Sequence, residues 1–329
     1  MPELERTARE EGAADLRIVA SRRRRFLVAS AVLAVVALAV AFAVERRSSG
    51  SSDPPPGSWT IVPYEGLGAW VDVYDWTDEF TAGAPPVGLA DIEAMADQGI
   101  QTLFLQTGHS RSASDVLETE RLTAIVDEAH KHDMHVVAWY LPTLVDLDED
   151  LRRLTRAAEL PVDGLSVDIE AIDVTDPAER TLRLLQLTEQ LRTAVGADKV
   201  LGAITLTAVH LEVLNPDYWP GYPWAELGAA YDAVLPMAYW SIRTGELRSG
   251  DRYIGENIDR IRVLVGAEVP VHGIGGIADA VTVEDLDGMV AALMERGAIG
   301  GSLYDWNTAR PEQWRALRSL RELRTEPEG

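Results

Sequence analysis

The stretch Asp163-Gly-Leu-Ser-Val-Asp-Ile-Glu170 decides the fold. It has the length and the Val/Ile content of a short buried strand, in which successive side chains point to opposite faces. Ser166, Asp168 and Glu170 therefore share one face, and the apolar residues between them share the other. Because the apolar face must meet helices, the two carboxylates are predicted to line the inside of a sheet that helices cover.

Seven more strand-like runs accompany this one along the chain. The eight predicted strands are Ala69–Tyr74, Thr102–Thr107, His135–Leu141, Gly164–Glu170, Val200–Thr207, Ala233–Tyr239, Val269–Ile274 and Ile299–Tyr304. Predicted helices between them include Thr119–His132, Pro177–Val195, Asn257–Val265 and Val283–Arg296. Successive strand–helix units indicate a parallel sheet, and eight of them in residues 59–329 predict an α/β fold, the (β/α)8 TIM barrel.

Two other architectures fit less well. A helical solenoid has no strand-like run in every unit. An open doubly wound sheet usually carries a Gly-rich dinucleotide loop after its first strand, and here that position reads Asp72-Val-Tyr-Asp-Trp76. In a barrel, reactive residues are expected at the carboxyl ends of the strands.

The first 58 residues differ in composition from the rest. Arg22–Arg25 precede the 19 uncharged residues Phe26–Val44, which as a helix would span about 28 Å, one hydrocarbon core. The arginines predict a cytoplasmic tail at 1–25, a transmembrane helix or export signal at 26–44, a Ser/Gly/Pro linker at 45–58 and an extracytoplasmic barrel. The long apolar run favours an uncleaved cell-membrane anchor, whereas cleavage after Ala43 would give a secreted protein.

Composition narrows the chemistry. The chain of 329 residues has 53 acidic and 30 basic side chains, and the part after residue 58 holds 46 and 21 of them. This acidic excess argues against nucleic acid as a partner. The absence of cysteine excludes Fe–S clusters, Cys-ligated zinc and cysteine nucleophiles, and only two lysines, Lys131 and Lys199, leave little room for Schiff bases. No cofactor and no metal is expected.

Asp168 and Glu170 suggest a reaction. The two residues are separated by about 6.6 Å along the strand, so the two carboxyls should not both ionise easily. One of them is expected to hold a proton near neutral pH. A protonated acid beside an anionic stabiliser is what cleavage of a glycosidic bond needs. The alternative is that the two acids only accept hydrogen bonds from loop amides or are exposed to solvent at the rim of the barrel.

The motif D-G-x-S-x-D-x-E at 163–170 resembles the D-G-x-D-x-D-x-E signature of the chitinase-like glycoside hydrolases of family 18, which lies on the fourth strand of a (β/α)8 barrel. Met237-Ala-Tyr239 is similar to that family's M-x-Y on the sixth strand. On the eighth strand, Gly300-Gly301 before Tyr304 and Trp306 is similar to its Gly-Gly to Trp ending.

The resemblance implies roles for four residues. Glu170 would be the proton donor, and Asp168 would orient or stabilise the substrate's 2-acetamido group as it attacks the anomeric carbon. Tyr239 would form a hydrogen bond with the same group, and Trp306 would form the floor of the sugar subsite. The implied substrate is an extracytoplasmic polysaccharide or oligosaccharide.

The sequence departs from the family pattern in three places. Ser166 replaces the middle Asp of the signature, and Trp240 stands where M-x-Y is usually followed by Asp. Trp306 lies one residue later than the usual tryptophan, with Asp305 in its place. The resemblance therefore supports the role of Glu170 as proton donor more strongly than it supports a specificity for 2-acetamido sugars.

Further substrate contacts are predicted near the strand ends. These candidates are Asp72, Gln106, His109, Tyr140, Ser166, Met237, Trp240, His272, Tyr304 and Trp306. The alternative for each is a polar or aromatic group that only satisfies its neighbours. His130, His132 and His135 fall at the opposite, non-catalytic face, where a metal site is not expected.

Three rival functions are compared with the sequence features that favour or oppose them. A phosphate-binding barrel is suggested by Gly273–Gly276 and Gly300-Gly301, but the acidic excess would repel its substrate. A metallohydrolase with paired histidines would carry that pair after the first strand, and this sequence has no histidine pair there. A non-catalytic, membrane-tethered carbohydrate-binding barrel is the stronger rival. Lectin-like members of the chitinase-like group commonly lack the acid at the position of Glu170, so its presence favours catalysis.

Overall fold

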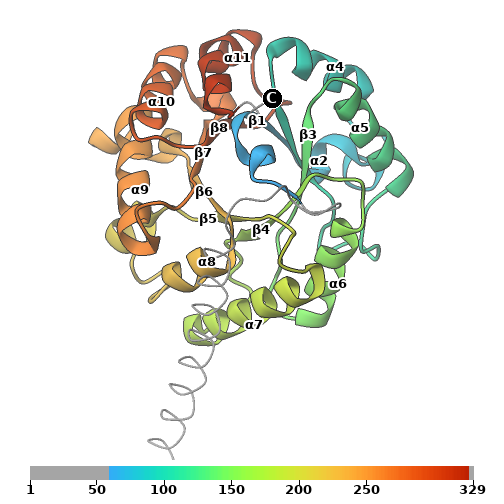
Figure 1. The fold of residues 1–329 in the computed structure, drawn as a ribbon, viewed down its shortest axis with the longest axis horizontal. Helices are drawn as coiled ribbons and strands as arrows, with labels where there is room; N and C mark the ends of the chain where they lie inside the picture. Colours follow the sequence, from blue (N-terminus) through green and yellow to red (C-terminus); the bar gives the residue numbers. More distant parts are fainter. Residues whose placement is uncertain (1–58, 326–329) are drawn as a thin grey trace, which may run out of the picture. The chain divides into compact units, whose positions relative to one another are not determined.

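The structure is a computed structural model, and it describes residues 59–325. Eight parallel strands close into a barrel in which each strand pairs with its neighbours in the sequence and β1 pairs with β8 (Figure 1). The strands are β1 Gly66–Val71, β2 Thr102–Gln106, β3 His135–Tyr140, β4 Gly164–Ile169, β5 Leu201–Thr205, β6 Ala233–Ala238, β7 His272–Ile277 and β8 Gly300–Tyr304. The predicted (β/α)8 barrel is confirmed.

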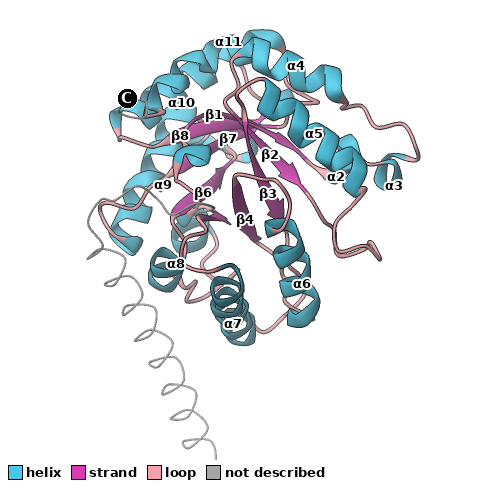
Figure 2. Ribbon diagram, turned by 45° about the vertical axis from the view of Figure 1, so that its right-hand side comes forward, coloured by secondary structure: helices cyan, strands magenta, loops and turns pink. Residues whose placement is uncertain are grey.

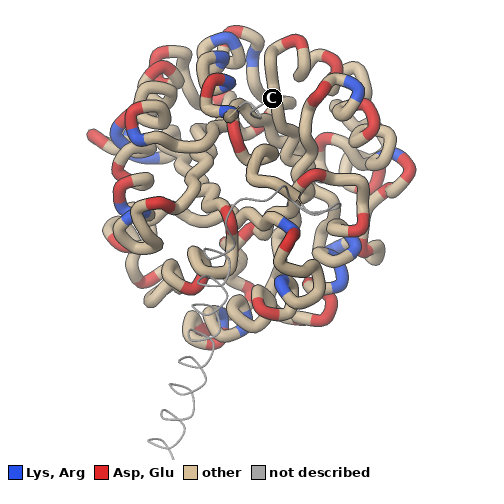
Figure 3. The backbone as a smooth tube through the Cα atoms, viewed as in Figure 1, with Lys and Arg blue, Asp and Glu red and all other residues tan. Residues whose placement is uncertain are grey.

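Helices surround the sheet on its outside (Figure 2). They are α2 Val73–Trp76, α3 Asp78–Thr81, α4 Leu89–Gln98, α5 Thr119–Lys131, α6 Leu147–Ala158, α7 Pro177–Val195, α8 Trp224–Ala230, α9 Gly250–Val265, α10 Val283–Glu295 and α11 Pro311–Leu317. Several begin at side chains that accept hydrogen bonds from free amides of the first turn, as Asp146 does in α6 and Asp176 in α7. Figure 3 shows acidic residues all around this ring of helices rather than on one face.

Two predicted strands are displaced. β1 ends at Val71, because the Asp72 carboxylate accepts the amide of Tyr74 at 2.7 Å and so starts the short helix α2. β7 begins at His272, three residues later than predicted, and α9 begins earlier, at Gly250. The other strands and helices lie within about two residues of the predicted bounds, the usual uncertainty at element ends.

The barrel interior is filled by its own apolar cluster, separate from the larger one between strands and helices. Trp70 stacks on Phe104 with ring centroids 4.3 Å apart and an interplanar angle of 9°. The Trp70 indole N–H donates to Ser302 Oγ at 2.8 Å. The interior is therefore a packed core, and chemistry is confined to its ends.

The amino-terminal end of the barrel is closed by Tyr64, whose hydroxyl donates to the carbonyl of Leu165 at 2.7 Å. His272 Nδ1 lies 2.8 Å from the Tyr64 carbonyl and Nε2 lies 2.9 Å from Ser302 Oγ. Because a carbonyl only accepts, Nδ1 donates and Nε2 accepts. Burial lowers the pKa of His272 to about 4, which keeps the ring neutral.

This arrangement corrects the prediction that His272 contacts substrate. It is the first residue of β7 and fully buried, because β7 begins three residues later than the apolar pattern suggested. In residues 59–325, no helix combines the length and the apolar character that a membrane crossing requires. The predicted membrane segment 26–44 lies outside the described residues.

Candidate active site

Asp168 lies at the carboxyl end of β4, and Glu170 follows the last residue of that strand. Val167 and Ile169 pack in the outer core, so Asp168 points to the barrel interior, as predicted. Asp168 is only 6% exposed, and its Oδ1 has no hydrogen-bond partner among the described residues. A buried carboxylate oxygen without a partner, at the end of a barrel where ligands bind, is unusual for a purely structural acid.

The electrostatics of the pair agree with the sequence argument. Burial raises the pKa of Asp168, and the nearby charge of Glu170 raises it further. Burial also raises the pKa of Glu170. The pair therefore resists double ionisation.

Tyr239 follows β6 directly and approaches the same pair. Burial raises its pKa first, and the charges of Asp168, Glu170 and Asp305 raise it further. The hydroxyl is therefore held protonated, ready to donate a hydrogen bond. Met237, two residues earlier, lies in the interior cluster beneath it.

The opposite side of the mouth carries a second set of acids, after β1 and β8. The Tyr304 hydroxyl donates to Asp72 Oδ2 at 2.7 Å, and Asp75 accepts from the Asp72 amide at 3.2 Å. Carboxylate oxygens of Asp72, Asp75 and Asp305 all lie within 4.8 Å of one another, a spacing that fits a cation. Burial raises the pKa of Asp75 to about 7, helped by the charges of Asp72 and Asp305.

Two predicted contacts are engaged by protein groups instead. Gln106 Oε1 accepts the amide of Val73 at 3.1 Å, and this bond holds the turn after β1. His109 lies at the rim, where its Nδ1 accepts the amide of Arg111 at 3.1 Å. Its pKa is lowered by burial and then by the charge of Arg111.

Three predicted contacts lie away from the mouth. Tyr140 points outward from β3 and donates to Asp150 Oδ1 at 2.8 Å, because the alternation of β3 turns Trp139 inward. Trp240 is 1% exposed and packs in the outer core, since the chain leaves β6 in a 3-10 turn. Ser166 is fully buried, one inward position below Asp168.

Trp306 does not floor the barrel mouth. Its indole N–H donates to Asp91 of α4 at 3.4 Å, and its ring stacks on Trp314 of α11 at 5.6 Å. The single-residue offset from the family pattern explains this, because it gives Asp305 the position that the tryptophan would hold.

Sequence reasoning missed several residues of the site. Tyr222 donates to the carbonyl of Ile169 at 3.4 Å, and its pKa is raised by burial and then by Asp168. Asp75 and Asp305 were not predicted either. One sequence signal was present for Asp75, since Asp72-x-x-Asp75 directly after a strand is a capping box.

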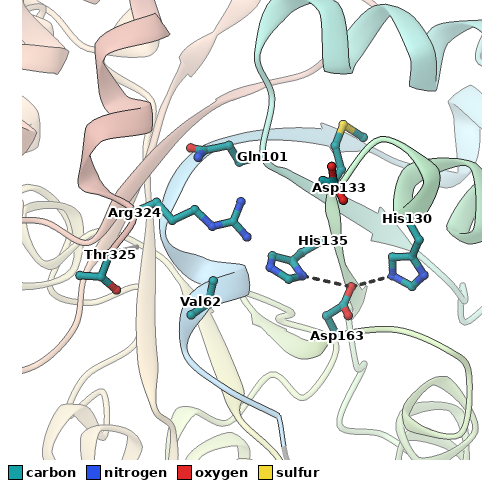
Figure 4. A pocket seen from close by; sticks show the side chains of 9 residues that line it. Val62, Gln101, His130, Asp133, His135, Asp163, Arg324 and Thr325 are labelled. Carbon is teal, nitrogen blue, oxygen red and sulfur yellow. Dashed lines mark hydrogen bonds and ion pairs between the residues drawn. The ribbon is translucent and has the colours of Figure 1, made fainter. Parts of the chain in front are cut away.

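A hollow of about 760 Å³ opens near the amino end of β3, at the face opposite the carboxylate pair (Figure 4). Asp163 Oδ2 accepts the amide of Val136 at 2.7 Å and lies 2.9 Å from His130 Nε2. His135 Nδ1 lies 3.6 Å from the same oxygen. The two histidines flank the carboxylate, as Figure 4 shows, and the cluster fixes the start of β3.

Comparisons with known proteins find similarity in structure but not in sequence. No protein-family model matches the chain, and no curated protein matches it. The spore cortex-lytic enzyme SleL of Bacillus cereus superposes with a TM-score of 0.57 at 9% identity, over 78% of this chain and 74% of that one. A chitinase from Chromobacterium violaceum gives 0.52 at 12%, over 78% and 98%, and an endo-β-1,4-mannanase from Thermotoga petrophila gives 0.58 at 10%, over 79% and 77%.

At such low sequence identity, these superpositions show a shared fold. The predicted resemblance to chitinase-like barrels is therefore confirmed at the level of architecture, and the solved structures that this chain resembles include chitinases and related (β/α)8 glycoside hydrolases.

Proposed function

We propose that the barrel is a glycoside hydrolase that acts on an extracytoplasmic polysaccharide containing 2-acetamido sugars. One observation carries the proposal: Asp168 faces inward at the carboxyl end of β4, and Glu170, which follows that strand directly, lies close enough for its charge to raise the pKa of Asp168. Glycoside hydrolases among the solved structures of the same fold support it, including a family 18 N-acetylglucosaminidase from Paenibacillus barengoltzii.

The proposed mechanism assigns one task to each of three groups. Glu170, whose pKa is raised by burial, gives its proton to the leaving oxygen as the glycosidic bond breaks. Asp168 accepts the acetamide N–H and stabilises the positive charge that develops while the acetamide oxygen bonds to the anomeric carbon. The Tyr239 hydroxyl donates to the acetamide carbonyl and orients it. Water then opens the ring intermediate and returns a proton to Glu170.

The second candidate is a membrane-tethered barrel that binds carbohydrate without cleaving it. The substitution at Ser166 and the burial of Trp240 favour it, because both change positions that the chitinase-like pattern uses. Glu170 favours catalysis. The full chain, in detergent, should be incubated with chitin oligomers, peptidoglycan glycan strands and neutral glucans. Release of shorter 2-acetamido products supports the proposal, and binding without product supports the tethered lectin.

We also propose that the barrel lies outside the membrane, anchored by residues 26–44. Protease added to intact cells should then degrade the barrel while a cytoplasmic marker protein survives, because Arg22–Arg25 favour the cytoplasmic side. Survival of the barrel, in cells whose outer layers admit the protease, contradicts this orientation.

Asp168→Asn should move the basic limb of the pH–rate profile to lower pH. Each carboxyl disfavours the charge of the other, as the effect of Glu170 on the pKa of Asp168 shows. Removal of the Asp168 charge therefore makes it easier for Glu170 to lose the proton that catalysis needs. An activated aryl glycoside keeps the rate measurable, and NMR of the carboxyl carbon follows the titration directly. Asp97→Asn, an exposed acid on α4, is the control, and an unmoved limb in Asp168→Asn excludes coupling.

A further inference from the structure

The loops that follow β5 and β6 carry a histidine and an arginine at the carboxyl end of the barrel, the end at which Glu170 lies. β4, β5 and β6 are neighbours in the sheet, and their loops lead to α7, α8 and α9, which are neighbours in the ring of helices (Figure 1). His210 begins a single helical turn after β5, and Arg243 lies four residues after Tyr239. We call His210 and Arg243 the basic pair.

Tyr253 of α9 and Thr207 hold the basic pair together. The hydroxyls of Tyr253 and Thr207 share a hydrogen bond of 2.7 Å, and the Thr207 hydroxyl accepts the backbone amide of His210 at 3.3 Å. The Arg243 guanidinium lies over the Tyr253 ring, 5.2 Å from its centroid. Burial lowers the pKa of His210, and the charge of Arg243 lowers it further. The two side chains are therefore close to each other.

The basic pair has no acidic partner among residues 59–325. Arg243 forms no ion pair with a described carboxylate, its Nε has no acceptor, and His210 Nδ1 has no hydrogen-bond partner there. Glu212, two residues after His210, accepts instead from the indole N–H of Trp224 at 3.1 Å. An arginine without a carboxylate is unexpected in a barrel with such an acidic excess.

Arg180 shows how a buried arginine is satisfied when it serves only the fold. It also has no ion pair with a described carboxylate, but its Nε donates to the carbonyl of Val174 at 2.9 Å and its Nη1 to the carbonyl of Tyr218 at 3.3 Å. Its guanidinium stacks on Trp219 at 4.6 Å. Buried polar groups in the core are generally hydrogen-bonded in this way. The unused donors of Arg243 therefore indicate a ligand from outside the chain.

Tyr218 connects the basic pair to the proposed catalytic acid. Its ring centroid lies 5.6 Å from that of His210, at an interplanar angle of 65°. Burial raises the pKa of Tyr218, and the charge of Glu170 raises it further, so Tyr218 also lies near Glu170. The basic pair is thus adjacent to the reacting bond, where a neighbouring sugar or its substituent would bind.

We propose that the basic pair binds a carboxylate carried by the glycan, so that the substrate is an acidic 2-acetamido polysaccharide. This inference rests on the proposed function and narrows its substrate. The Nε and one Nη of a guanidinium form two parallel donors that match the two oxygens of a carboxylate. His210 adds a third donor when Nδ1 carries a proton. Both side chains are partly exposed, so a substituent of the glycan can reach them.

The acidic excess of the barrel does not prevent this binding. At physiological ionic strength, exposed charges more than about 8 Å apart are largely screened, so the groups that contact the carboxylate determine its affinity. Asp72, Asp75 and Asp305 gather on the other side of the mouth, after β1 and β8. A neutral substituent at the basic pair would leave the guanidinium without an anionic acceptor, and it should bind more weakly.

The test compares an acidic ligand with its neutral copy. The full chain carrying Glu170→Gln, in detergent, is titrated by calorimetry at pH 7 with a β-1,4-linked hexamer in which N-acetylglucosamine alternates with N-acetylmuramic acid. The neutral copy is the same hexamer with each carboxylate converted to a carboxamide. We expect the acidic hexamer to bind about tenfold more tightly, because hydrogen bonds to a charged acceptor are stronger than those to an amide.

Substitutions then assign the preference to the basic pair. Arg243→Gln, added to this background, should abolish it, and His210→Gln should weaken it. Arg243→Lys keeps the charge but not the two parallel donors, so it should retain part of the preference. Arg315→Gln, at an exposed arginine on α11, is the matched control and should leave the preference unchanged. Thermal unfolding confirms that each variant is folded.

A second pair of ligands identifies the source of the carboxylate. A hexamer of alternating N-acetylglucosamine and glucuronic acid carries it directly on the sugar ring, and its carboxamide is again the neutral copy. A preference for either acid that Arg243→Gln abolishes upholds the inference. Equal binding of the acidic and neutral forms, binding of none of them, or a preference that survives Arg243→Gln overturns it.

The inference and the proposed function can fail separately. A preference for the acidic form by a wild-type protein that hydrolyses none of the hexamers upholds the inference and refutes the proposed function. Hydrolysis of 2-acetamido glycans without the preference refutes the inference and upholds the proposed function.

Discussion

Glu170→Gln should lower hydrolysis of an unactivated glycan by about 10² to 10⁴ while binding survives. The amide has nearly the shape of the acid and still donates a hydrogen bond, but it cannot transfer a proton to the leaving oxygen. Glu170 follows the last residue of β4, and burial raises its pKa, which is the direction that a proton donor needs. Product release measures the rate, and calorimetry on the same glycan measures binding.

Two comparisons separate this role from simple loss of structure. An aryl glycoside with a good leaving group needs little protonation, so Glu170→Gln should slow its hydrolysis far less. Glu93→Gln, an exposed acid on α4, should change neither rate. Equal hydrolysis of the unactivated glycan by wild type and Glu170→Gln would remove Glu170 as the acid, whatever the rest of the site does.

The sequence predicts which side chains of a strand face the barrel interior where the pattern is polar at alternate positions. In β4, Asp168 and Glu170 alternate with Val167 and Ile169, so only one orientation buries the apolar side chains. β3 has no such signal. It runs His135–Tyr140 with apolar or aromatic residues on both faces, and the sequence did not show that Trp139, not Tyr140, faces inward.

The parts of the site that sequence missed lie where strand periodicity ends. Asp75 belongs to a helical turn rather than to β1, and Asp305 follows β8 at a cis peptide bond with Tyr304. Alternation along a strand says nothing about side chains beyond its last residue. The same applies to Trp306, which packs against α4 and α11. The sequence thus predicted the carboxylate pair and Asp72, whereas the contribution of Asp75 and Asp305 became visible only in the fold.

The largest effect on stability is expected from Trp70→Ala, about 3 to 5 kcal/mol of unfolding free energy. Trp70 is 2% exposed in the barrel interior, and its loss leaves a cavity beside Phe104 that the closed sheet can collapse only partly. It also removes the indole N–H that donates to Ser302 Oγ, and this hydroxyl in turn is hydrogen-bonded to His272 Nε2. Chemical denaturation followed by circular dichroism measures the change.

Trp70→Phe separates packing from hydrogen bonding. It keeps an aromatic ring against Phe104 and removes the donor to Ser302, so we expect a smaller loss, about 1 to 3 kcal/mol. Trp306→Ala is the external control, because that ring is only partly buried against the outer helices. A loss below about 1 kcal/mol for Trp70→Ala would mean that the interior is not the packed core described here. The acids at the mouth next to Trp70 would then lack a rigid support, since the backbone amide of Trp306, the residue after Asp305, donates to the Trp70 carbonyl at 3.0 Å.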